Sequence, residues 1–203
     1  KVIMVMSSLS KVRGDIILNA PLAKYSWFQV GGAADILFKP CDIEDLFCFL
    51  KNIPENLKIT VIAGGSNLII RDGGVRGATI FLRNRLNNIK LNAKGNIEVE
   101  AGVSNFKIYT FAKQNNIANI EFLGTIPGTI GGAIRGNAGC YGSEVKDILL
   151  EFQAMDYRGE LKTFRKDEFD FSYRKNNLPN NLIFVRAIID GHNKKETFEI
   201  EET

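Results

Sequence analysis

Short apolar runs, bounded by turn residues, recur along the whole chain. Runs of this length with such flanks predict β-strands rather than helices. In one of them Glu98 and Glu100 alternate with apolar residues, so we expect a strand with one face in water. The predicted strands span residues 59–63, 68–70, 78–82, 97–101, 149–157 and 182–189.

Two other segments show the spacing of amphipathic helices. In the first, Asp42 is placed to cap a helix with apolar residues three and four positions apart, which ends near Asn52. The second begins with Ser104 as its N-cap and stops at Asn115-Asn116. The first helix lies between strand-like runs in residues 36–63, which predicts a small β-α-β unit. The later strands have no helices between them, so we expect antiparallel pairing.

These elements predict an α+β fold in two lobes, although the length alone also allows a single domain. The apolar pattern lapses between Arg83 and Lys94, which places a first lobe at residues 1–83 and a second at 84–190. Residues 191–203 would begin a further domain. The end of the chain resembles the start of a helix without a breaker, so we expect continuation beyond Thr203, with a disordered tail as the alternative.

Composition excludes several classes of protein. Of the 203 residues 45% are hydrophobic and 24% charged, which is typical of a globular protein, and the net charge of +3 does not suggest a nucleic-acid partner. The three cysteines include no Cys-x-x-Cys pair, which argues against a disulfide framework and a metal site. We find neither a signal peptide nor a membrane span. We therefore expect a cytoplasmic protein with no metal, nucleic-acid or membrane partner. A monomer is also expected, although nothing in the composition fixes the oligomeric state.

Two glycine-rich stretches carry the candidate chemistry. Gly64-Gly65-Ser66-Asn67 follows an apolar run directly, and adjacent glycines let backbone amides approach an anion, although these residues also suit a plain turn. The stretch from Gly124 to Gly132 can wrap around a bulky ligand, with Thr125 and Thr129 as additional donors, although a pair of tight turns is the alternative. Neither stretch has the pattern of a Rossmann or P-loop motif. Together they predict a pyrophosphate cradle for a dinucleotide, with a flavin favoured.

Five motifs in order resemble those of the UDP-N-acetylenolpyruvoylglucosamine reductases. They are Trp27-Phe28-Gln29-Val30-Gly31-Gly32, the two glycine stretches, Asn137-Ala138-Gly139-Cys140-Tyr141-Gly142 and Ser172-Tyr173-Arg174. The resemblance covers about residues 21–190. It implies an FAD-binding fold of the PCMH type, in which two subdomains hold the cofactor between them.

The resemblance also implies a reaction and the residues that serve it. FAD would be the cofactor, NADPH the electron donor, and the enolpyruvyl ether of UDP-N-acetylglucosamine the substrate that is reduced to UDP-N-acetylmuramate for peptidoglycan. Arg174 matches the catalytic arginine, whose planar guanidinium suits a carboxylate, and Tyr173 either lies against the substrate or fills the core. The implied cofactor-binding residues are Gly64, Gly65, Ser66, Asn67, Ile126, Pro127, Gly128, Thr129, Gly131, Gly132, Asn137, Ala138 and Gly139.

The sequence departs from this family at some points. The family's serine proton donor and its glutamate belong to a C-terminal domain, and neither motif occurs here, so we expect a chain without its substrate domain that does not turn over. Gly136 stands where relatives carry a larger apolar residue. Cys140 is expected to be an apolar neighbour of the cofactor and His192 an exposed turn residue. The alternatives are another FAD-dependent oxidoreductase of this architecture, such as an aryl or sugar alcohol oxidase, or an FAD-binding module without catalysis.

Overall fold

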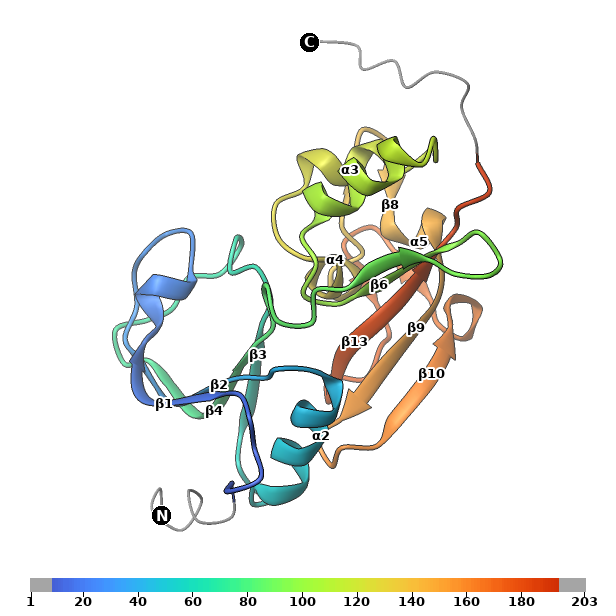
Figure 1. The fold of residues 1–203 in the computed structure, drawn as a ribbon. Helices are drawn as coiled ribbons and strands as arrows, with labels where there is room; N and C mark the ends of the chain where they lie inside the picture. The colour runs from blue at the N-terminus through green and yellow to red at the C-terminus, as the bar shows by residue number, and fades with distance from the viewer. Residues whose placement is uncertain (1–8, 194–203) are drawn as a thin grey trace.

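The first lobe is built on a mixed four-stranded sheet. A computed structural model of the chain describes residues 9–193, and Figure 1 shows them as two lobes side by side. The strand order is β1-β2-β4-β3, with β1 antiparallel to β2 and the other pairs parallel. Its strands are β1 (Asp15–Pro21), β2 (Ala33–Lys39), β3 (Ile59–Ile62) and β4 (Val75–Phe81), with a 3-10 turn, η1 (Leu22–Tyr25), after β1.

The predicted β-α-β unit is present, with one difference. Helix α2 (Ile43–Asn52) connects β2 to β3, but β4 lies between these two strands in the sheet. The Asp42 side chain accepts a hydrogen bond from the Asp45 amide (2.8 Å), which confirms the predicted cap. The buried Asp45 carboxylate in turn accepts amide hydrogen bonds from Arg13, Gly14 and Cys41, which fixes the helix start against the chain before β1.

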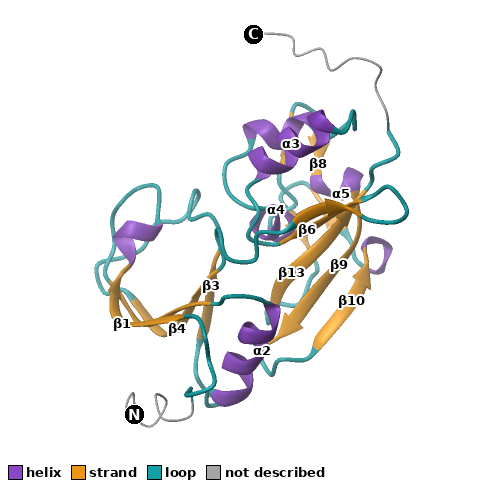
Figure 2. Cartoon of the chain, viewed as in Figure 1, coloured by secondary structure: helices purple, strands orange, loops and turns teal. Residues whose placement is uncertain are grey.

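The second lobe is built on an antiparallel five-stranded sheet, as predicted. The strand order is β10-β9-β13-β6-β5. Helices α3, α4 and α5 pack on one face of this sheet, and α2 of the first lobe packs on the other (Figure 2). The strands are β5 (Ile89–Leu91), β6 (Ile97–Glu100), β9 (Leu149–Asp156), β10 (Leu161–Arg165) and β13 (Leu182–Ile189), and the helices are α3 (Asn105–Gln114), α4 (Ile130–Arg135) and α5 (Val145–Ile148).

Short elements connect these layers. The predicted cap of α3 is confirmed, since Ser104 Oγ accepts the Lys107 amide hydrogen bond (3.2 Å). His192 is exposed, as expected. The connecting elements are η2 (Glu121–Thr125), η3 (Lys166–Glu168), and the two-stranded pairs β7–β8 (Gly139–Cys140, Ser143–Glu144) and β11–β12 (Phe171–Ser172, Lys175–Asn176).

Two expectations about strands were wrong. Residues 68–70 form a loop instead of a strand, and Ile69 in this loop is 71% exposed. Just after the loop, the Arg71 carbonyl accepts a hydrogen bond from the Gly32 amide. Strand β6 does not have one face in water. Glu100 is buried, because its carboxylate accepts the Asn88 amide hydrogen bond (2.8 Å), and Glu98 is only partly exposed beside Lys90 and Arg186. A local pattern cannot reveal such non-local partners.

The two lobes meet where the sequence loses its apolar pattern. The first sheet ends at Phe81 and the second begins at Ile89, so the segment between them connects the sheets. Division into separate domains at residue 83 stays a prediction. The lobes share one apolar cluster, in which Phe49 of α2 packs with Ile183 and Val185 of β13. The helix-like start expected from residue 194 lies outside the described residues.

Candidate functional site

The two glycine stretches lie directly against each other. A Cβ atom on Gly64 would fall 2.5 Å from Gly128 Cα, and Ser66 Oγ donates a hydrogen bond to the Pro127 carbonyl (3.3 Å). Gly128 has φ +107°, a conformation that side chains with a Cβ rarely adopt. Residues 64–67 of the first lobe and 126–129 of the second therefore form one surface that spans both lobes.

This surface has unpaired donors. Among the residues that the structure describes, none accepts a hydrogen bond from the backbone amides of Gly65, Ser66 or Asn67. The Thr129 hydroxyl is buried and has no partner within the same part of the chain. Buried donors of proteins are nearly always paired, and clustered free amides make an anion-binding concavity. The residues present thus fit the pyrophosphate of a dinucleotide.

The glycines of α4 serve two different purposes. The amides of Ile130 and Gly131 bond to carbonyls of the second lobe, at Val103 (3.1 Å) and Ala101 (3.0 Å). A Cβ on Gly131 would lie 3.0 Å from the Ala101 Cβ, so the close packing of α4 against the end of β6 explains this glycine. Gly132 is exposed and lines a cavity between the lobes.

That cavity has a volume of about 350 Å³, within the range of ligand sites. Strand β3 forms one wall, and α4 with the start of β13 forms the opposite wall. It adjoins the glycine surface through Ala63 and Gly132. Its lining residues are Ile59, Thr60, Val61, Ala63, Leu82, Gly131, Gly132, Arg135, Tyr157, Asn180, Leu182 and Phe184. The site therefore continues from the cradle into a space between the sheets.

Arg135 lines this cavity, and sequence reasoning missed it. Its guanidinium donates to the carbonyls of Pro179 (3.0 Å) and Leu182 (2.9 Å) and lies 4.9 Å from the Phe184 ring centroid. Burial lowers the pKa of Arg135, and burial also raises the pKa of Tyr157 nearby. An arginine in the last turn of a helix is ordinary in a sequence, so no local signal distinguishes it.

Asn137-Ala138-Gly139 supports the site from within the protein. The buried Asn137 amide donates to Glu144 Oε2 (3.1 Å) and to the Ser172 carbonyl (2.9 Å), while its oxygen accepts the Lys146 amide hydrogen bond (3.1 Å). Ala138 packs in the second-lobe core, with Cys140 beside it. Their implied contacts with the cofactor, like those of the other predicted cofactor residues, stay a prediction.

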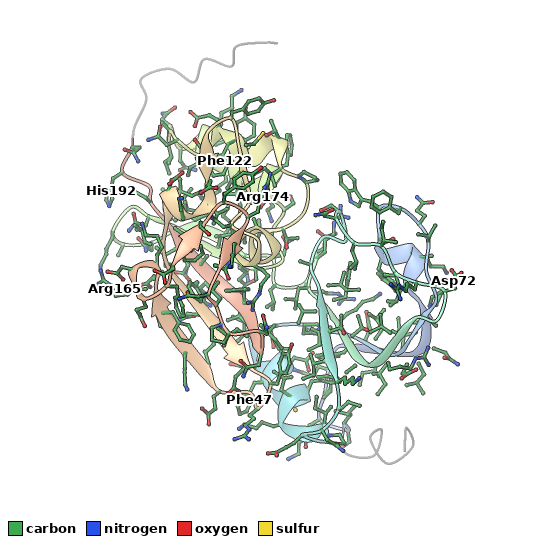
Figure 3. All side chains as sticks on the ribbon, turned by 180° about the vertical axis from the view of Figure 1, so that it is seen from behind. Phe47, Asp72, Phe122, Arg165, Arg174 and His192 are labelled. Carbon is green, nitrogen blue, oxygen red and sulfur yellow. The ribbon has the colours of Figure 1, made fainter. Side chains whose placement is uncertain are left out.

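Arg174 and Tyr173 form the turn between β11 and β12. Arg174 has φ 54°, and its Nη2 donates to the Gly139 carbonyl (3.0 Å). Tyr173 is 80% exposed, so the expectation that it might fill the core was wrong. In Figure 3 Arg174 lies in the upper half of the second lobe, whereas Phe47 of α2 marks the lower end where the lobes join.

Other kinds of site find no support in the described residues. Within residues 9–193 there is no group of three or more His, Cys, Asp or Glu side chains that could hold a metal ion. Over the same range, no helix combines the length and apolar character needed to cross a bilayer.

Two lobes that share a glycine cradle, with a cavity between their sheets, define a dinucleotide-binding protein. The chain belongs to the FAD-binding domain family, whose model matches residues 34–165. This membership confirms the predicted fold class and FAD as the predicted cofactor. It also accounts for glycine loops that have neither the Rossmann nor the P-loop pattern.

Named relatives narrow the resemblance. The chain is 45% identical over 181 residues to the UDP-N-acetylenolpyruvoylglucosamine reductase of Rickettsia bellii, which covers 89% of this chain and 60% of the relative. It is 42% identical over 193 residues to the Orientia tsutsugamushi reductase, covering 94% and 64%. These matches confirm the resemblance drawn from the five motifs. The chain spans about 60% of the length of the relatives it matches.

Solved structures agree with this result. The reductase from Thermus caldophilus aligns with a TM-score of 0.76 at 27% identity, over 90% of this chain and 64% of that one. A chitooligosaccharide oxidase aligns with a TM-score of 0.67 at 15% identity, over 92% and 42%. At such low identity the second likeness shows the fold alone.

Proposed function

We propose that this chain is the FAD-binding part of a UDP-N-acetylenolpyruvoylglucosamine reductase. Its reaction is the reduction of UDP-N-acetylglucosamine enolpyruvate to UDP-N-acetylmuramate with NADPH, a step in making peptidoglycan precursors. The observation that carries the proposal is the contact between the two glycine stretches, which leaves the amides of residues 65–67 and the Thr129 hydroxyl without described partners. A monomeric state and a cytoplasmic location remain predictions.

The glycine surface holds the cofactor's pyrophosphate in this proposal. The amides of Gly65, Ser66 and Asn67 donate to its oxygens from the first lobe, and Thr129 donates from the second. When bound, FAD supplies the hydride chemistry that no side chain of the described residues can provide. Because donors come from both lobes, the ligand also stabilises their contact.

Arg174 meets the carboxylate of the enolpyruvyl group. Its guanidinium stays charged at any working pH, and one nitrogen is held by the Gly139 carbonyl while the side chain remains exposed. A fixed cation beside the substrate carboxylate stabilises negative charge that develops on the neighbouring carbon during reduction. Tyr173, whose ring centroid lies 5.7 Å from the guanidinium carbon, limits where that group can move.

The second candidate is another FAD-dependent oxidoreductase, and its support is the fold shared with the oligosaccharide oxidase. The two candidates differ in the electron donor. A reductase takes electrons from NADPH, whereas an oxidase of that kind takes them from a sugar.

The test begins with titration of the purified chain with FAD. Quenching of the flavin fluorescence measures the binding. Anaerobic stopped-flow mixing with NADPH should then bleach the flavin absorbance, with an oligosaccharide as the comparison donor. Bleaching by the sugar alone would favour the oxidase. Arg174→Ala should keep its FAD affinity, because within residues 9–193 the Arg174 side chain donates to the Gly139 carbonyl and not to the cradle. A chain that takes up no FAD would refute the proposal.

A further inference from the structure

The short hairpin that carries Arg174 in its turn has few contacts of its own to hold that turn in place. Strands β11 and β12 pair at only two positions, which leaves a two-residue turn of Tyr173 and Arg174. Turns that match the twist of a two-residue hairpin need a positive φ at the first or at both positions, but here only Arg174 has one. So short a hairpin is also unstable in water by itself. The position of the turn therefore depends on contacts outside it.

These contacts come from the end of α4 and the residues that follow it. On one side of the turn, Asn176 Nδ2 donates to the Arg135 carbonyl (2.8 Å). On the other side, Asn137 Nδ2 donates to the Ser172 carbonyl (2.9 Å). The turn is thus held at both ends by residues only two positions apart, which fixes its direction as well as its place.

The Arg135 side chain extends this support along the chain. Its guanidinium donates to the carbonyls of Leu178 (3.4 Å), Pro179 (3.0 Å) and Leu182 (2.9 Å). Arginine carries five donors in a fixed planar arrangement, so several carbonyls must be in place together to satisfy a half-buried guanidinium. This side chain therefore holds the segment from Leu178 to Leu182 against α4.

The opposite end of α4 belongs to the cofactor site. Its first amides are fixed to Val103 and Ala101, and Gly132 lines the cavity beside the cradle. A six-residue helix is a short, stiff spacer of about 1.5 Å per residue. The same helix therefore links the wall of the cofactor cavity to the anchors of the Arg174 turn.

We propose that Arg135 and Asn137 are positioning residues for Arg174, which hold its turn at a fixed place relative to the glycine cradle. The inference rests on the proposed function, in which Arg174 meets the substrate. It gives Asn137 a role different from the cofactor contact implied by the family resemblance, because the amide of Asn137 already makes three hydrogen bonds within the protein.

Limited trypsin digestion tests this role, because Arg174 and Lys175 are both exposed cleavage sites. Asn137→Gly removes the amide while tolerating the φ of +39°. We expect cleavage at the turn to become about tenfold faster or more, since proteolysis follows the open population and three hydrogen bonds are lost, among them the one to the Ser172 carbonyl. Cleavage after Lys94, in the exposed β5–β6 turn, should keep its rate as the internal control.

Arg135 variants provide the second arm. Arg135→Ala should likewise accelerate cleavage at the turn, and Arg135→Lys should restore only part of the protection, because an ammonium group cannot reach all three carbonyls. Saturating FAD should slow cleavage at the turn more in the wild-type chain than in the variants. The Kd of Asn137→Gly for FAD should stay within about threefold, because the Asn137 side chain is already bonded within the protein.

Several outcomes would overturn the inference. Unchanged cleavage at the turn would show that other contacts hold it, and equal acceleration after Lys94 would show general unfolding instead of local release. A loss of FAD affinity with normal protection of the turn would make Asn137 a cofactor residue. If the wild-type chain takes up no FAD, the proposed function fails, while digestion without FAD still decides whether the two residues hold the turn.

Discussion

At the scale of single residues, contacts between loops explain the glycines as much as ligand approach does. Gly64 is needed because Gly128 of the other lobe lies where its Cβ would be, and Gly131 because α4 packs against Ala101. Gly65, with φ +64°, and Gly128, with φ +107°, have backbone conformations that favour glycine by themselves. A glycine-rich motif therefore reports close packing of several kinds.

Gly64→Ala tests the contact between the two stretches without backbone strain, because Gly64 has no positive φ. The added methyl group must push the 126–129 loop away, and overpacking of this kind costs about 1–3 kcal/mol. We expect FAD affinity to fall by about tenfold or more, since each 1.4 kcal/mol is a factor of ten. Titration of flavin fluorescence measures the change.

Gly73→Ala is the matched control, since its Cβ would meet nothing within 4 Å. FAD affinity and thermal stability should both stay near the wild-type values. Equal affinities in the two variants would contradict the close contact between the loops.

The sequence showed only some of the site residues. The glycine stretches were visible as composition, and Arg174 through its motif. The supporting roles of Arg135 and Asn137 were not visible, because they depend on carbonyls 35 to 47 positions away in the chain. Residues that bind through side-chain chemistry have local signals, whereas those that hold other residues in place do not.

At the scale of elements, the segment from Asn137 to α5 contains an ion pair between Glu144 and Lys146. The Glu144 carboxylate lies 2.6 Å from Lys146 Nζ and also accepts from Asn137 Nδ2. The hydrogen bond from Lys146, assisted by that from Asn137, holds the pKa of Glu144 below its ordinary 4.5. A carboxyl with a lowered pKa in the folded state stabilises the protein above its unfolded pKa, and this contribution is lost as the pH falls through the folded pKa.

The wild type should therefore lose stability between about pH 5 and pH 3, the window below the ordinary carboxyl pKa, and Glu144→Gln should lose less of it over the same window. At pH 7 the variant should melt at a lower temperature than the wild type, and the difference should shrink in acid. Thermal unfolding of both proteins at pH 7 and at about pH 3 measures this difference in melting temperature. Lys146→Gln, which removes the pair from the other side, should behave alike. A difference that is constant with pH would rule out this pair.

The sequence predicted the helices, which have local start signals, but it did not predict the strand order, which depends on pairing between distant segments. Caps at Asp42 and Ser104 placed α2 and α3 correctly, because the capping side chain lies within three residues of its partner. The insertion of β4 between β2 and β3 had no such signal, since it depends on strands far apart in the chain. The strand predicted at residues 68–70 was wrong because an apolar run in a loop has the same local pattern as a strand.

At the scale of the whole molecule, the lobes are joined by a common core. Helix α2 packs its inner side on the first sheet through Phe38 and Phe49, whose rings stack 4.1 Å apart. The same apolar cluster contains Met155, Ile183 and Val185 from the face of the second sheet opposite α3 and α4. Neither lobe buries this cluster alone, so the cradle lies beside an apolar core that both lobes share.

Ile183→Ala tests whether the lobes unfold together. Removing a fully buried isoleucine from this shared cluster should lower the free energy of unfolding by about 2–5 kcal/mol. The single tryptophan, Trp27, reports on the first lobe, while far-ultraviolet circular dichroism reports on both. If the junction couples them, the two signals share one midpoint in urea and shift together in the variant.

Leu150→Ala, at a 41% exposed position on β9, should shift neither. Separate midpoints, with Trp27 emission unaffected by Ile183→Ala, would show that the lobes are independent and that the cradle is assembled only when the ligand binds.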